Sequence, residues 1–76
     1  MIDVKDIDVI DRINLFLNNR TYTFIKLNSG KILNGYITEQ NKGNITFKDD
    51  ELGKIPILIK EIEIIDYSNK KRGGSI

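Results

Sequence analysis

The amino-acid sequence predicts a mainly β fold, in which an N-terminal α-helix precedes a five-stranded, strongly bent antiparallel barrel. Apolar residues recur at helical spacing near the N-terminus, and from residue 21 onward the period changes to two. Turn signals then divide the chain into five short runs. A helix followed by short alternating strands is the pattern of a small, partly open barrel. We expect one domain over residues 1–67.

The helix is expected over about residues 6–18. Its apolar stripe consists of Val9, Ile10, Ile13, Phe16 and Leu17. Leu15 lies outside the stripe, and Asn18 or Asn19 can take the left-handed conformation that ends a helix. The apolar stripe would close one end of the barrel.

The first two strands are expected at residues 21–27 and 31–39, because β-branched and aromatic residues stop at the turn signal of residues 28–30. Gly35 lies inside the second run, and a glycine inside a strand indicates a bulge or a sharp bend. Strong curvature is what a small barrel needs.

A third strand, with Ile45 and Phe47 directed inward, follows a turn at residues 40–43. Residues 49–53 then form a polar loop that carries three consecutive acids. Consecutive carboxylates do not readily converge on one ion, and the spacing of a calcium loop is absent. We therefore expect a solvated loop and no metal site.

The last two strands, at residues 55–59 and 62–65, form the most apolar stretch of the chain. Simple alternation sets Leu58 and Ile65 on one face, and on the other Ile57, Ile59, Ile62 and Ile64. Both faces therefore require cover, which a second copy of the chain could provide. The candidate subunit-interface residues are Ile57, Leu58, Ile59, Ile64 and Ile65. Pro56 cannot donate to a β-ladder, so it should lie at an edge or a bulge.

Composition excludes several functions. The chain has no cysteine and no histidine, which removes disulfides, thiolate metal sites and the commonest general base. Twelve basic against eleven acidic residues give a net charge of +1, which argues against nucleic-acid binding through bulk charge. No apolar run is long enough to span a membrane, and no secretory leader is recognisable. We expect a cytoplasmic binding module that is not an enzyme and needs no cofactor.

Local groups can still contact nucleic acid. The amides of Asn41 and Asn44 offer a donor and an acceptor to a base edge, and Lys60 can contact a phosphate. The alternative is that the asparagines serve turn geometry and that Lys60 is a solvated charge. Residues 68–76 are expected to be a disordered basic tail, whose electrostatic candidates are Lys70, Lys71 and Arg72. Strand aromatics can stack on bases but are more often core, which is where we expect Tyr22, Phe24 and Tyr36.

The run IKLNSGKILNGYI, residues 25–37, resembles the first motif of the Sm-like family, and the bacterial-type Hfq proteins more than the spliceosomal ones. The resemblance covers residues 8–67. Asn41 stands where the family usually has aspartate, and Asn44 where Sm proteins have a base-contacting asparagine. The second motif departs from the family. Hfq proteins have Tyr-Lys-His and Sm proteins Arg-Gly there, whereas Lys60 is the only basic residue at that position here.

This resemblance implies an Sm-like or SH3-like barrel under the helix, a ring formed by pairing of the fourth and fifth strands of neighbours, and single-stranded RNA around the pore. Pro56 would remove one hydrogen bond of that pairing, and Gly43 stands where many members place a base-stacking side chain. We expect a homo-oligomeric RNA-binding protein. The alternative is a protein-interaction or assembly module with the same barrel that does not bind RNA.

Overall fold

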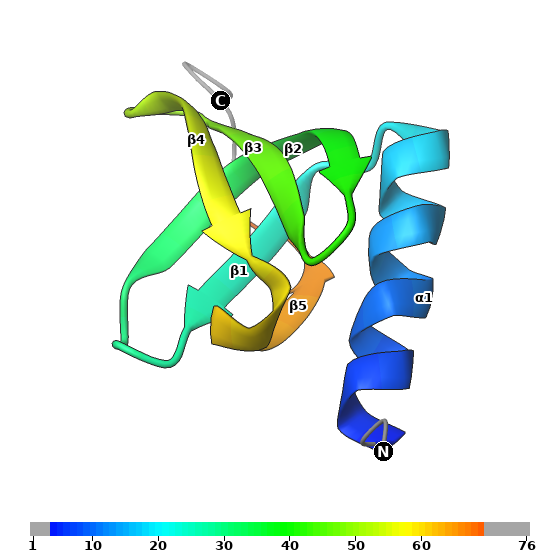
Figure 1. Ribbon diagram of the computed structural model, residues 1–76. Helices are drawn as coiled ribbons and strands as arrows, with labels where there is room; N and C mark the ends of the chain where they lie inside the picture. The colour runs from blue at the N-terminus through cyan, green and yellow to red at the C-terminus, as the bar shows by residue number, and fades with distance from the viewer. Residues whose placement is uncertain (1–3, 70–76) are drawn as a thin grey trace.

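The structure, a computed structural model, describes residues 4–69 and consists of one helix packed on one antiparallel sheet (Figure 1). In chain order its elements are α1 (Val4–Asn19), β1 (Thr23–Leu27), β2 (Ile32–Asn41), β3 (Asn44–Asp49), β4 (Gly53–Leu58), the 3₁₀ turn η1 (Ile59–Glu61) and β5 (Ile62–Tyr67). The strand order is β4-β3-β2-β1-β5. The expected mainly β fold is thus confirmed, although β4 and β5 do not pair and the sheet stays open.

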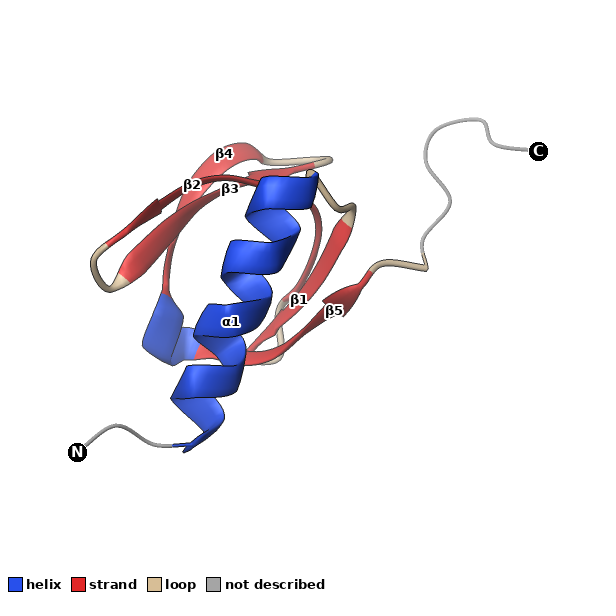
Figure 2. Cartoon of the chain, turned by 90° about the vertical axis from the view of Figure 1, so that its right-hand side faces the viewer, coloured by secondary structure: helices blue, strands red, loops and turns tan. Residues whose placement is uncertain are grey.

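Helix α1 lies across the mouth of the curved sheet (Figure 2). It buries Val9, Ile13 and Phe16, which recur every three or four residues, whereas Leu15 is 48% exposed. These helix residues complete a single core that also contains Ile25, Leu33, Ile37, Ile45, Phe47, Ile57, Ile62 and Ile65. The helix stripe therefore closes one end of the sheet, as the sequence predicts.

The helix ends one residue later than expected, and the left-handed residue is Arg20, with φ of 53°. The Thr21 N–H donates to Phe16 O at 3.0 Å and the Arg20 N–H to Leu17 O at 3.3 Å, which is the Schellman pattern. The expectation that Asn18 or Asn19 takes this conformation was wrong. A non-glycine residue at this position costs about 1–2 kcal/mol.

Strand β2 has two special positions, a bulge at Thr38 and a close backbone approach at Gly35. A register shift between Ile37 and Glu39 inserts one extra residue against β3, so the bulge lies at Thr38 and not at Gly35. Gly35 serves a close approach of backbones, since a Cβ built there would lie 1.9 Å from Lys48 O. The expected bulge therefore lies three residues beyond Gly35, and the glycine itself is required by packing against β3.

Strand β5 has a bulge that simple alternation misses. Lys26 pairs with Ile64 and Leu27 with Ile62, so one residue of β5 is extra. As a result Ile62 and Ile65 are both buried, and Ile64 is 41% exposed. Placing Ile62 and Ile64 on one face was therefore wrong. Pro56, as expected, lies on the edge strand β4.

The β1–β5 ladder extends past Tyr67, because the Ser68 N–H donates to Tyr22 O at 3.0 Å. Ser68 was assigned to the tail but is held to the sheet. Residues 70–76, and with them the predicted disorder of the tail, lie outside the described residues.

Candidate nucleic-acid interface

Three connections between strands are joined by hydrogen bonds of η1: residues 28–31, residues 41–44 and residues 59–61, named here the turn cluster. The Ile59 N–H donates to Gly43 O at 3.0 Å, which joins η1 to the β2–β3 hairpin. On the other side the Asn28 N–H donates to Glu61 O at 2.8 Å. Because η1 bonds to both turns, it bridges the gap between the two edges of the sheet.

The two predicted asparagines lie opposite each other at the base of the hairpin. Asn41 pairs with Asn44 in the β2–β3 ladder, and Gly43, with φ of 85°, allows the tight turn between them. Asn41 is exposed and Asn44 is half-buried. The Oδ1 atom of Asn44 is buried and accepts no hydrogen bond from the described residues.

Lys60 lies in η1 with its side chain exposed. Its backbone oxygen accepts a hydrogen bond from Nδ2 of Asn28 at 3.1 Å. The structure thus brings Asn41, Asn44 and Lys60 to one end of the molecule, from segments up to 19 positions apart in the sequence (60 − 41 = 19). Sequence reasoning missed Asn28, which appeared only as part of a turn signal, although its side chain and backbone hold η1 in place.

The tail candidates Lys70, Lys71 and Arg72 lie outside the described residues, so their contribution stays a prediction. Of the interface candidates, Ile57 and Ile65 are each 3% exposed and belong to the chain's own core. They are therefore not available to a partner in this structure. Ile59 is partly buried against the core, whereas Leu58 and Ile64 are 43% and 41% exposed.

Tyr22, Phe24 and Tyr36 do not lie in the core, so that expectation was wrong for these three residues. Thr23 and Ile25 point inward from β1, which directs Tyr22 and Phe24 to the outer face, where both are half-buried. Tyr36, from β2, lies beside Tyr22, with ring centroids 5.4 Å apart. These rings lie on the outer face of the sheet.

The acidic loop also differs from the expectation. Asp49 is 8% exposed and not solvated, because its carboxylate accepts hydrogen bonds from the backbone N–H groups of three residues: Asn34 at 3.2 Å, and Glu51 and Leu52 at 2.9 Å each. Asp50 accepts a hydrogen bond from the Tyr22 hydroxyl. Asp49 organises the β3–β4 turn. Among residues 4–69 no group of three or more His, Cys, Asp or Glu side chains could hold a metal ion.

A groove of about 780 Å³ lies away from the turn cluster, between the C-terminal end of α1 and the middle of β2. It is lined by Leu17, Asn18, Arg20, Tyr36, Ile37 and Thr38. None of the lining residues of this groove is one of the predicted RNA contacts Asn41, Asn44 and Lys60.

No family model matches the sequence, and no curated protein matches it. Within residues 4–69, α1 is neither long nor apolar enough to cross a membrane.

Proposed function

We propose that this chain binds single-stranded RNA at the turn cluster as a homo-oligomer, and that it acts as a binding module and not as an enzyme. Asn44 and Asn41 would contact base edges, and Lys60 a phosphate.

The observation that carries the proposal is the Oδ1 atom of Asn44. A buried polar atom without a hydrogen bond is uncommon in folded proteins and calls for a partner. Because this oxygen is buried, a base edge could reach it only after the Asn44 side chain rotates out of the turn, where its amide accepts and donates as base edges do. Asn41, exposed across the hairpin, can offer a second amide to the same nucleotide.

Charge supports the same location. Each of the three connections carries one exposed lysine, Lys31, Lys42 or Lys60, and the only acid among these residues is Glu61. The turn cluster therefore has a net charge of +2 (3 − 1 = 2), although the whole chain has only +1. Several phosphates of a flexible strand could be neutralised there.

Assembly would make the weak site useful. Strands β4 and β5 are the two edges of the sheet, and each has six residues. Pairing of two different edges is a heterologous contact, which closes into a ring when the rotation allows it. A ring would repeat the turn cluster around its axis, and several weak contacts to one strand add by avidity.

The test is fluorescence anisotropy of labelled single-stranded oligonucleotides, titrated with protein over a series of salt concentrations. Lys60→Ala should weaken binding and reduce the slope of log K against log salt by about 0.7, the value for one lost phosphate contact on a single strand. Asn44→Ala should weaken binding without changing that slope. The matched control is Lys54→Ala, which removes the same charge from an exposed site on β4. Equal effects of the two lysine variants, or no binding at low salt, would contradict the proposal.

One observation favours the alternative, a module that binds protein and not RNA. On the outer face Lys26 lies between Ile32 and Ile64, which are 55% and 41% exposed, and Phe24 lies on the same face one row away. Exposed isoleucines on an uncovered face of a sheet, with a phenylalanine beside them, are suited to contact with a protein surface. If the wild type binds no oligonucleotide, and a double serine variant of Ile32 and Ile64 loses a protein that the wild type retains on an affinity column, this second function applies.

A further inference from the structure

The free edge of β5 is occupied by groups of the same chain. Ser68 N–H donates to Tyr22 O, and Ile25 pairs with Ile65, so the ladder directs the N–H and C=O of residues 64, 66 and 68 toward β1. The corresponding groups of Ile65 and Tyr67 therefore point away from β1, to the free edge. A strand added to β5 would have to bond to them.

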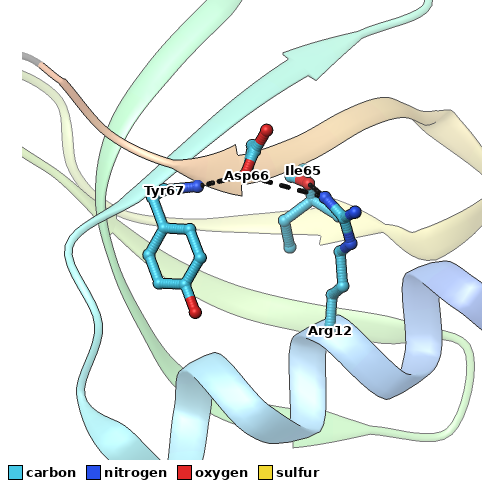
Figure 3. Close-up of polar contacts among 4 residues, drawn as sticks. All are labelled: Arg12, Ile65, Asp66 and Tyr67. Carbon is cyan, nitrogen blue, oxygen red and sulfur yellow. Dashed lines mark hydrogen bonds and ion pairs between the residues drawn. The ribbon is translucent and has the colours of Figure 1, made fainter.

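Two of these outward groups already have partners (Figure 3). Nη1 of Arg12, on α1, donates to Ile65 O at 2.7 Å. The Tyr67 N–H donates to Oδ1 of Asp66 at 2.8 Å, and the same carboxylate oxygen lies 3.7 Å from Arg12 Nη1. The carbonyl oxygen of Ile65 and the N–H of Tyr67 are thus already hydrogen-bonded, to two charged side chains that also form an ion pair with each other.

We propose that Arg12 and Asp66 form a latch that closes β5 against strand addition, and that a second copy associates by its β4 only when the latch opens. The inference rests on the assembly part of the proposed function. A second copy fits as the occupant because β4 is the other open edge of the same sheet and has the same length as β5, with one donor fewer at Pro56.

The latch is suited to reversible opening. The side chains of Arg12 and Asp66 are 53% and 58% exposed, so water can replace their contacts at small cost. A hydrogen bond from a charged donor to a backbone oxygen nevertheless opposes an incoming strand, which must displace it. The latch therefore sets the concentration at which copies associate, without preventing association.

The experiment is sedimentation equilibrium of the full chain from the micromolar to the millimolar range, with wild type and three variants. Arg12→Met keeps most of the aliphatic side chain but removes every donor, and it should lower the association midpoint by about tenfold. Asp66→Asn removes the ion pair but keeps the Arg12 contact to Ile65 O, so its shift should be in the same direction and smaller. The matched control is Arg20→Met, an exposed arginine outside the contacts with β5, which should leave the midpoint unchanged.

An association midpoint of Arg12→Met equal to or above that of the wild type would overturn the latch, as would association in none of the four proteins. Asp66→Asn keeps the test valid if Arg12→Met does not fold. RNA binding by the wild type together with an unshifted Arg12→Met midpoint would refute the latch and leave the proposed function intact. A lower association midpoint for Arg12→Met, together with no RNA binding by the wild type, would support the latch and refute RNA binding.

Discussion

Gly35→Ala is the substitution whose effect the structure predicts most sharply. The added Cβ would lie 1.9 Å from Lys48 O, 2.9 Å from Lys48 C and 3.1 Å from the Cα of Asp49. All three atoms are backbone, so no side chain can rotate away, and β3 itself must move. Gly35 lies between Thr23 on β1 and Asp49 on β3, which means that the shift would disturb two ladders.

Overpacking of a well-packed site costs typically about 1–3 kcal/mol. Replacing glycine by alanine also stabilises the folded protein by about 0.4–1 kcal/mol, because alanine lowers the conformational entropy of the unfolded chain. Because the obstacle is backbone, we expect a net loss near the upper end, about 2–3 kcal/mol. A chain of 76 residues has a free energy of unfolding of about 4–11 kcal/mol, so the loss is a large part of the whole.

The assay is thermal unfolding followed by circular dichroism. For a domain of this size each kcal/mol shifts the Tm by about 4–8 °C, so Gly35→Ala should lower it by about 8–24 °C. The control is Gly30→Ala, where φ is 95° and nothing lies within 4 Å of the new Cβ. Its cost is backbone strain alone, about 1–2 kcal/mol. If Gly35→Ala lowers the Tm no more than Gly30→Ala, the close approach of β2 and β3 is not what requires glycine.

Three further predictions concern stability and can be measured by urea denaturation. Asp49→Ala should cost about 2–3 kcal/mol of unfolding free energy, because three backbone N–H groups lose their acceptor. The control Asp50→Ala, at an exposed carboxylate, should cost less than about 1 kcal/mol. Similar losses for the two variants would show that the buried carboxylate is dispensable. Arg20→Gly should stabilise the chain by about 1 kcal/mol, since glycine takes a φ of 53° without strain, and a loss of stability would mean that the arginine side chain holds the helix end. Ile65→Ala should cost about 2–5 kcal/mol of unfolding free energy and Ile64→Ala much less, because the Ile65 side chain is 3% exposed and that of Ile64 is 41% exposed. A larger loss for Ile64→Ala than for Ile65→Ala would refute the bulge in β5.

Local pattern predicted the elements of the fold well. Val9, Ile13 and Phe16 repeat at a spacing that only a helix brings to one face, and Leu15 falls outside that face in both the pattern and the structure. Glycines at residues 30, 43 and 53 mark turns because each has a positive φ. These signals act over a few residues, so neighbours in the sequence are enough to read them.

The candidate site was predicted as residues, but its assembly depends on long-range contacts. Nothing local indicates that Asn28 holds η1, 32 positions away, or that η1 bonds to Gly43. The turns at the two ends of β2 are both bonded to η1, and the bend of β2 between them depends on how β2 pairs with β3. Asp49 was misplaced partly for the same reason, since one of the three hydrogen bonds to its carboxylate comes from Asn34, on a neighbouring strand.

The sequence by itself determined the helix, the five strands, their turns and the edge position of Pro56, because helical and strand periods, turn glycines and a missing N–H are local properties. Only the tertiary structure decided which side chains of β5 are buried, that Tyr22, Phe24 and Tyr36 lie on the outer face, and that Arg12 contacts the β5 edge. One extra residue in a ladder turns every side chain beyond it to the other face of the sheet. The free edge of a strand is defined only by which strands pair with it, and that pairing is long-range.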